Sequence, residues 1–500
     1  MAIHDTQSSA SNEVDHEIGN SENAKSKDWY RLATLAGEQG EIFDEELHSR
    51  NRRLWNRWAL GSLSEDTLHA TRDNQILDRK LLNEISEETL LSLFRERGLS
   101  TIPTAYEKID FSNTVWTTSA DFNGFIFPLP VSFQGTIFDD DVDFTNAKFL
   151  DDAFFQDACF NGTAFFQNVS FFETCSLNAT KFHDTAVFDG STFCGGAFFD
   201  NAHFCDFSGF DGCKFKCEAS YNSAEFIEAV SFDGTAFDGD VGFLKAVFHD
   251  SASFLDVSFL AGADFTDSYF AEMSFFERAS FLDQVRFHNT VFGKIVLFEN
   301  VRFSATVSFT NAVFEDDVPI FFGATFQDGV EFTGAQWPPL INTRRASEKM
   351  SMAYGALKRA MLAVGRDDLA QEFYILELRS LRYCVSPTTM VAIFIYDVVS
   401  RFGTSIARPI FLALLVALMS CTLYHSILPG ISYLQAMQIT ISAFLGPFGN
   451  MDRITATLAA GSQSLTTVLM LGDVQFLMGV CLTFLIAQAF RYRFRIRRLQ

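Results

Sequence analysis

Residues 144–171 read FTNAKFLDDAFFQDACFNGTAFFQNVSF, and phenylalanine recurs in this stretch at alternating intervals of five and six residues. The recurring positions are Phe144, Phe149, Phe155, Phe160, Phe166 and Phe171. One bulky apolar side chain that returns at a fixed spacing indicates an internal repeat.

The repeat has a period of eleven residues and runs through the middle of the chain. Of 19 positions taken every eleven residues from Phe111, 17 are Phe, and of 19 taken from Trp116, 18 are Phe. Because the whole chain holds 58 Phe in 500 residues, chance does not account for this density. Residues 111–337 therefore form one repeat array, and the exceptions within the two series are Trp116, Leu177 and Tyr221.

A small residue precedes nearly every repeating aromatic by two positions, as Ala153 precedes Phe155. Residues i−2 and i lie on one face of an extended chain, so both side chains are expected to point inward. Asn, Gly or Asp stands two residues after 15 of the 19 aromatics of the first series, as expected for tight corners. The predicted structural core includes Phe144, Phe149, Phe155, Phe160, Phe232, Phe237, Phe243 and Phe248.

An eleven-residue period is also typical of right-handed coiled coils. Positions five residues apart lie about 140° apart around a helix, so the two aromatic series would not form one stripe. Regularly placed Gly, Asn and Asp would also weaken such a helix. The interpretation that remains is a solenoid built from short strands and corners.

The unit of a small residue, any residue and then Phe, repeated about every five residues, resembles the pentapeptide-repeat proteins. The resemblance implies a mainly β fold, a right-handed quadrilateral β-helix with four short sides per coil and aromatic side chains stacked along its axis. Four sides correspond to 22 residues, so the array predicts about 9.5 coils. The register slips by one residue at Pro319, which we interpret as the approach to the end of the regular helix.

Charge and motifs restrict the function. The chain carries 38 basic and 62 acidic residues, and residues 111–337 alone hold 9 basic and 33 acidic ones. This balance disfavours a nucleic acid as the main partner. Nine scattered cysteines contain no CxxC pair, and no HExxH, GxSxG or P-loop motif occurs. The sequence therefore predicts no enzyme, cofactor or metal site, and a reducing compartment.

The flanks of the array are predicted to be helical caps, because solenoid ends otherwise expose unpaired strand edges. Residues 1–28 are polar and are expected to be disordered. Residues 29–110 show helical apolar spacing, which predicts a cap or, alternatively, a partner-binding helical module. After Pro338 and Pro339, residues 338–386 predict a pair of helices that caps the other end.

The remaining segment, 387–500, is predicted to be a membrane domain that contacts the lipid bilayer. Residues 409–428 and 468–490 are long and apolar enough to span it, and residues 388–400 suit an interfacial helix. Arginines stand outside both spans, so the positive-inside rule places both termini and the repeats in the cytoplasm of a bacterial cell, with a multi-pass inner membrane anchor. A homo-oligomer through this domain is one further expectation.

Between the spans, residues 431–450 form an apolar segment that is expected to be re-entrant. A helix, a half-helix, a Gly-rich turn and a second helix resemble the two-span pore module of potassium-type channels. The pore-like positions would be Thr440, Gly446, Phe448 and Gly449, although Thr440 is displaced and Pro447 interrupts the loop.

These features favour a membrane-anchored scaffold whose rigid acidic rod binds an unidentified protein partner. The candidate partner surface consists of five apolar residues that are expected to point outward: Phe154, Phe165, Phe198, Phe275 and Leu297. The alternative is that these side chains only form ladders between successive coils and have no further role. One alternative is an ion-channel-like protein with a cytoplasmic repeat domain. A further alternative, implied by the resemblance to soluble pentapeptide-repeat proteins, is a DNA mimic that inhibits a topoisomerase.

Overall fold

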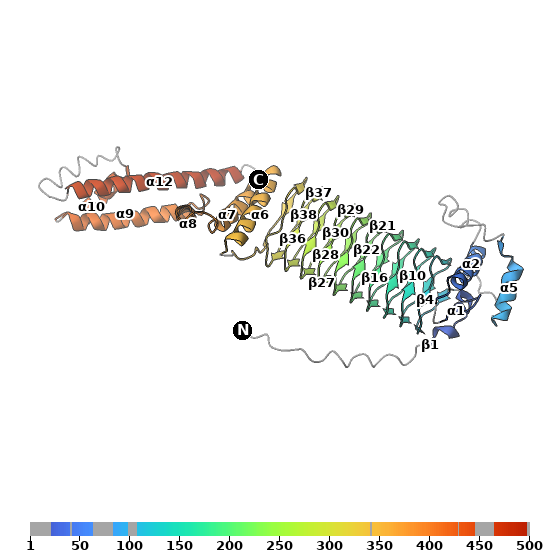
Figure 1. The fold of residues 1–500 in the computed structure, drawn as a ribbon. Coiled ribbons are helices and arrows are strands. Elements are labelled where there is room, and N and C mark those ends of the chain that lie inside the picture. Colours follow the sequence, from blue (N-terminus) through green and yellow to red (C-terminus); the bar gives the residue numbers. More distant parts are fainter. Residues whose placement is uncertain are drawn as a thin grey trace, which may run out of the picture. The chain divides into compact units, whose positions relative to one another are not determined.

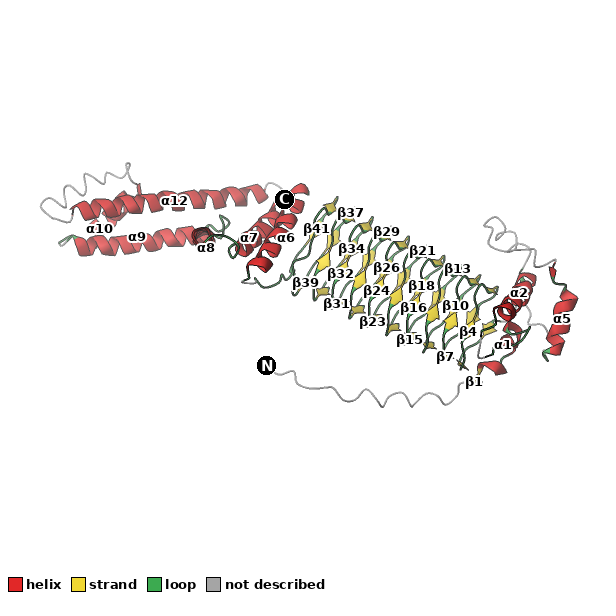
Figure 2. Cartoon of the chain, in the orientation of Figure 1, coloured by secondary structure: helices red, strands yellow, loops and turns green. Residues whose placement is uncertain are grey.

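The structure is a computed structural model that describes residues 22–40, 43–63, 84–98, 108–340, 343–428, 430–445 and 465–497. The chain divides into two compact units, Met1–Pro339 and Leu340–Gln500. The first unit contains a parallel β-solenoid with helices at its N-terminal end, and the second is helical (Figures 1 and 2).

The solenoid consists of four parallel sheets, which have 11, 11, 9 and 10 strands in the described part of the chain. From β2 to β39, successive strands of a sheet pair at a spacing of 22 residues, so that Phe226 lies beside Phe248. This register confirms the predicted fold of four sides per coil.

We name each sheet by its first and last strands. The β1–β39 sheet contains β1 (Glu22–Asn23), β3 (Thr114–Trp116), β7 (Ile137–Phe138), β11 (Cys159–Phe160), β15 (Lys181–Phe182), β19 (His203–Phe204), β23 (Glu225–Phe226), β27 (Val247–Phe248), β31 (Tyr269–Phe270), β35 (Val291–Phe292) and β39 (Val313–Phe314). The β2–β41 sheet contains β2 (Ile109–Asp110), β6 (Val131–Ser132), β10 (Ala153–Phe154), β14 (Cys175–Ser176), β18 (Ala197–Phe198), β22 (Ala219–Ser220), β26 (Val241–Gly242), β30 (Ala263–Asp264), β34 (Val285–Arg286), β38 (Val307–Ser308) and β41 (Val330–Glu331).

The other two sheets follow in each coil. The β4–β36 sheet contains β4 (Ala120–Asp121), β8 (Val142–Asp143), β12 (Ala164–Phe165), β16 (Ala186–Val187), β20 (Ser208–Gly209), β24 (Val230–Ser231), β28 (Ala252–Ser253), β32 (Ser274–Phe275) and β36 (Val296–Leu297). The β5–β40 sheet contains β5 (Ile126–Phe127), β9 (Lys148–Phe149), β13 (Ser170–Phe171), β17 (Thr192–Phe193), β21 (Lys214–Phe215), β25 (Ala236–Phe237), β29 (Ser258–Phe259), β33 (Ser280–Phe281), β37 (Arg302–Phe303) and β40 (Thr325–Phe326).

The repeating phenylalanines fill the centre of the solenoid. All eight predicted core residues, from Phe144 to Phe248, are fully buried. Rings one coil apart stack face to face, with 4.8 Å between the ring centroids of Phe243 and Phe265. Rings on opposite sides meet edge to face, as Phe243 and Phe254 do at 5.7 Å and 89°. Both arrangements are favourable for aromatic quadrupoles.

Hydroxyl groups at the small inward positions tie successive coils together. Thr180 Oγ1 donates to the carbonyl of Phe155 at 2.8 Å, and Thr290 Oγ1 donates to that of Phe265 at 2.7 Å. In both cases the acceptor lies 25 residues earlier, in the preceding coil. These bonds pair polar groups that burial would otherwise leave unsatisfied.

The predicted corners have left-handed backbone. All 19 positions that follow the first aromatic series by two residues have φ between 53° and 71°. Gly, Asn and Asp adopt this conformation most readily. Four corners carry other residues, and these positions bear strain: Ala179, Ser223, Lys245 and Arg278.

Three helices lie at the N-terminal end of this unit: α1 (Asp28–Ala33), α2 (Glu45–Ser62) and α5 (Glu87–Glu96). Of these, α1 and α2 contact the first coil. Trp55 Nε1 on α2 donates to the carbonyl of Ile126 at 2.6 Å. The Asn56 side chain accepts from the Ile126 amide at 2.8 Å and donates to the Gly124 carbonyl at 2.9 Å. Helix α2 thus pairs backbone groups at the edge of the first coil, as a cap must.

The strand ladder begins before Phe111, and at the other end the aromatic stack reaches Trp337. Residues 1–28 were predicted to be disordered, but β1 pairs with β3 and the 3-10 turn η2 (Ala24–Ser26) follows it. The rest of this prediction, for residues 1–21, lies outside the described residues. After Pro319 the aromatic stack continues for one more coil with a spacing of 23 residues, since Phe298 stacks on Phe321 at 4.8 Å. The slip is therefore a one-residue insertion that the stack absorbs, not its end.

The described residues of the second unit form six helices: α6 (Arg344–Ala363), α7 (Asp367–Leu381), α8 (Pro387–Ser400), α9 (Ala407–Ile427), α10 (Tyr433–Leu445) and α12 (Leu465–Arg497). Helices α6 and α7 form a hairpin that Lys358 and Glu377 link by an ion pair of 2.5 Å. Arg379 on α7 binds the Asp397 carboxylate on α8 through two hydrogen bonds, of 2.9 and 3.0 Å.

Relieving corner strain should stabilise the solenoid. We expect Lys245→Asn to raise the local free energy of opening by about 0.5–1 kcal/mol, because Asn tolerates φ near 57° better than Lys does. Hydrogen exchange of the amides in β23, β27 and β31 would measure this.

The matched control is Gly234→Ala, since Gly234 has φ of 67° and nothing lies within 4 Å of an added Cβ. It should cost about 1 kcal/mol through the backbone alone. Unchanged protection in both variants would contradict the strain argument.

Tyr221 should be destabilising relative to Phe at its position. Its hydroxyl is buried without a hydrogen-bond partner, and burial raises the pKa of the phenol well above its ordinary value. We expect Tyr221→Phe to raise the free energy of unfolding by about 1–2 kcal/mol. Phe243→Tyr, one coil away, should lower it by a similar amount, and far-ultraviolet circular dichroism during thermal unfolding would test both.

Candidate functional site

The five outward apolar residues expected to bind a partner lie on two sheets that are not consecutive within a coil. Phe154 and Phe198 lie on the β2–β41 sheet, and Phe165, Phe275 and Leu297 lie on the β4–β36 sheet. All five are half-buried. Their surroundings therefore decide which of them present apolar surface.

Phe154 and Phe198 are separate from each other and partly covered. Ser176 lies between them in the strand ladder. The Lys108 ammonium lies 5.4 Å from the centroid of the Phe154 ring, and the Phe198 ring lies over Gly196. These two residues do not form a joint surface.

The β4–β36 sheet carries two apolar ladders with a polar gap between them. Phe165 pairs with Val187 near the N-terminal end of the solenoid. Gly209, Ser231 and Ser253 occupy the next three coils. The second ladder then consists of Phe275, Leu297 and Ile320, each beside the next.

The second ladder is the centre of a larger apolar surface, which we call the β32–β36 patch. Met273 stands two residues before Phe275 and is 41 % exposed, and Phe322 stands two residues after Ile320 and is 63 % exposed. Of these residues, only Phe275 and Leu297 were expected from the sequence. The spacing of 23 residues across Pro319 relates Ile320 to Leu297, and Met273 and Ile295 are 22 residues apart, so the repeat could have identified them; Phe322 follows Glu299 by 23 residues, and the spacing does not point to it. The patch consists of Met273, Phe275, Ile295, Leu297, Ile320 and Phe322.

Acidic groups follow the strands that carry the patch. Glu277 and Glu299 occupy equivalent positions in successive coils, two residues after Phe275 and Leu297. Burial and the negative charge of Glu299 raise the pKa of Glu277, and its Oε2 atom is buried without a hydrogen-bond partner. This carboxylate would gain from a cationic group. The site thus combines apolar area with two neighbouring carboxylates.

Many carboxylates elsewhere on the solenoid are engaged by the backbone. Asp189, Asp211 and Asp233 each accept a hydrogen bond from an amide in the next coil, at 2.9, 2.9 and 3.0 Å. These carboxylates accept hydrogen bonds from backbone amides at the corners, where the strand ladder provides no acceptor. Part of the acidity therefore has a structural cause, and the alternative of a DNA mimic gains no support from it.

Potential metal ligands do not cluster within the described ranges. No group of three or more His, Cys, Asp or Glu there could hold a metal ion. His203 and His249 are exposed and flank Glu225, at 3.1 and 2.8 Å.

Two helices of the second unit are long and apolar enough to cross a membrane, Ala407–Ile427 and Met470–Arg491. Only 11 % and 17 % of their most apolar windows are buried within the chain. Phe411, Leu418 and Phe484 are each more than 65 % exposed. Both helices therefore present apolar side chains that the rest of the described chain does not cover.

Helix α10 packs between these two helices and is held by polar groups. Tyr424 Oη on α9 donates to Gln475 Oε1 on α12 at 3.2 Å, and Gln475 Nε2 donates to the Thr440 carbonyl at 3.0 Å. Thr440 itself is buried, and its hydroxyl donates to the Ala436 carbonyl. The other pore-like positions, Gly446, Phe448 and Gly449, lie outside the described residues.

Comparisons with known proteins identify the repeats. A family model described as pentapeptide repeats (9 copies) matches residues 122–170 and 276–320, both within the solenoid. No curated protein and no solved structure matches the chain. The solenoid is thus built from pentapeptide repeats.

Proposed function

We propose that this pentapeptide-repeat protein is a membrane-anchored scaffold whose solenoid binds a protein partner through the β32–β36 patch. The observation that carries the proposal is the ladder of Phe275, Leu297 and Ile320, flanked by the exposed Met273 and Phe322. Apolar side chains on a rigid sheet bind a partner at little entropic cost, because they are already ordered.

The chemistry of the patch defines the partner. Its apolar area suits aliphatic or aromatic side chains, and Glu277 and Glu299 suit a lysine or arginine beside them. The partner segment would therefore be apolar with at least one basic residue.

The second unit supplies the anchor. Two apolar helices suit two spans, with Arg401 and Arg408 before the first and Arg491 at the end of the second. By the positive-inside rule both ends and the solenoid would face the cytoplasm at the inner membrane. The solenoid would then meet partners at the membrane surface.

The scaffold proposal predicts site-specific capture. A photo-crosslinking amino acid at Phe322 should capture a partner in native membranes, and Phe275→Asp should reduce the yield at least tenfold by placing a charge in the apolar contact. Mass spectrometry of the adduct would identify the partner.

The matched control places the crosslinker at Leu282, which is 48 % exposed and belongs to the corner after β33, outside the patch. Equal capture from both positions, or capture that Phe275→Asp leaves unchanged, would contradict a specific site.

One observation favours a second function, that of an ion-channel-like protein. The short helix α10 lies between α9 and α12 and precedes the Gly-rich segment, as a pore helix would. This alternative predicts current across a planar bilayer that holds the purified chain. Gln475→Leu, which removes the bonds to Tyr424 and Thr440, should lower that current, and a silent bilayer would contradict the alternative.

A further inference from the structure

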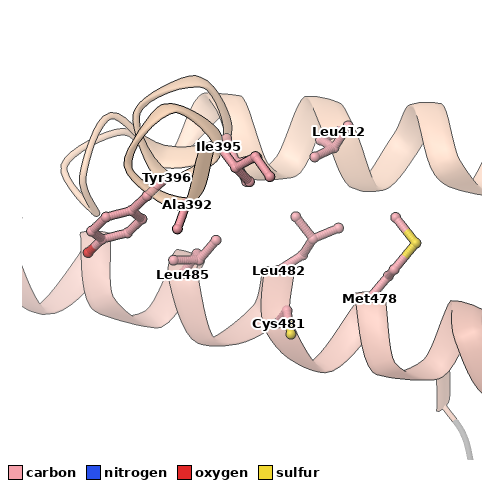
Figure 3. A pocket seen from close by; sticks show the side chains of 9 residues that line it. Ala392, Ile395, Tyr396, Leu412, Met478, Cys481, Leu482 and Leu485 are labelled. Atoms are coloured by element: carbon pink, nitrogen blue, oxygen red, sulfur yellow. The ribbon is translucent and has the colours of Figure 1, made fainter. Parts of the chain in front are cut away.

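An apolar groove lies between α8, α9 and α12 in the second unit. Its volume is about 450 Å³, and its walls are almost free of polar surface. Figure 3 shows Ala392 and Ile395 of α8 opposite Leu482 and Leu485 of α12, with Leu412 of α9 closing a further side. The groove therefore combines the interfacial helix with both membrane-spanning helices.

Polar groups surround the end of the groove nearest the arginines. Tyr396, on the groove wall, exchanges hydrogen bonds with Gln488, and Gln488 Nε2 lies 3.1 Å from the Tyr396 hydroxyl. Arg408 precedes Leu412 by one helical turn, so the two residues share a face of α9. The Nη1 atom of Arg408 donates a hydrogen bond to the carbonyl of Asp397 at 2.9 Å. This bond holds the guanidinium beside the C-terminal end of α8.

The arginines at this end make no ion pair with a described residue, although the Glu372 carboxylate interacts electrostatically with Arg401. The carboxylate of Asp397 is engaged by two hydrogen bonds from Arg379. Arg408 thus contacts a backbone carbonyl and no carboxylate, and Arg401 and Arg491 are likewise exposed without an ion pair to any described residue. A multiply hydrogen-bonding anion would complement these guanidinium groups.

We propose that this groove binds one acyl chain of an anionic phospholipid, whose phosphate lies against Arg408. The inference rests on the proposed membrane anchoring. Arg401 and Arg491 add positive potential at the same level and favour anionic over neutral headgroups. The lipid would pack α8 against the two spans and so fix the interfacial helix that Arg379 links to α7.

The size and neighbours of the groove favour this occupant over a helix of another chain. A helix with side chains is about 10–12 Å wide, so 450 Å³ would hold only about one turn. A second apolar groove, lined by Val416, Met419, Leu423 and Leu471, has about 550 Å³. Arginine lines neither groove, but Leu412 of the first lies one helical turn from Arg408, whereas Val416 is two turns away. Charge therefore distinguishes the first groove.

The test uses the full-length chain reconstituted in nanodiscs that contain equal amounts of phosphatidylglycerol and phosphatidylcholine. After extraction into mild detergent, native mass spectrometry would count the phospholipids that remain bound. We expect about one retained phosphatidylglycerol per chain. Ala392→Trp, which fills the groove, should reduce the retained lipid about tenfold, and the milder Leu485→Phe should reduce it severalfold.

Charge variants test the headgroup contact. Arg408→Gln should reduce retained phosphatidylglycerol about fivefold, whereas Arg408→Lys should keep most of it. The matched bulk control is Leu418→Trp, at a position that is 68 % exposed on the outer face of α9, and it should retain as much lipid as the unaltered chain.

The outcomes separate the two proposals. Release of the unaltered chain from membranes by alkaline carbonate would overturn the anchoring itself. A chain that stays in membranes while Ala392→Trp and Leu485→Phe retain phosphatidylglycerol fully would overturn the groove alone. Equal retention of phosphatidylcholine, or no effect of Arg408→Gln, would overturn the assigned headgroup contact.

Discussion

Face-to-face stacking of aromatic rings one coil apart sets the geometry on which the solenoid depends. The stacked rings lie close to the strand spacing, 4.8 Å for Phe243 on Phe265, so side-chain and backbone pairing reinforce one another. The coil of 22 residues follows from its four sides of five or six residues each. The extra residue at Pro319 is tolerated because the bulge leaves the rings in register, as Phe298 on Phe321 shows.

The tight coils strain the backbone at the corners and leave some of its amides unpaired, and polar residues at these positions reduce both effects. Each corner must turn within a few residues, which requires left-handed backbone at positions such as Asn146 and Lys245. Amides that the strand ladder does not pair find acceptors in carboxylates such as Asp211. Some of the residues that make the chain acidic therefore hold successive coils together.

The apolar helices of the second unit follow a different principle, because α9 and α12 expose apolar side chains while Tyr424, Thr440 and Gln475 are buried between helices. Gln475 links three helices through Tyr424 and Thr440, and Asp397 joins α7, α8 and α9 through Arg379 and Arg408. In an apolar solvent such internal hydrogen bonds hold helices in place where the hydrophobic effect contributes little.

The sequence by itself determined the solenoid, because a local repeat of small residue, spacer and Phe specifies an inward face whatever surrounds it. It also predicted the apolar helices, whose lengths follow from composition. Only the tertiary structure decided which outward residues act together: Ile320 joins Phe275 and Leu297 across an insertion, whereas Phe154 and Phe198 are separated by Ser176. The burial of Thr440 and the groove beside Arg408 were likewise beyond sequence reasoning. Both arise from packing between helices distant in the chain, which no local pattern encodes.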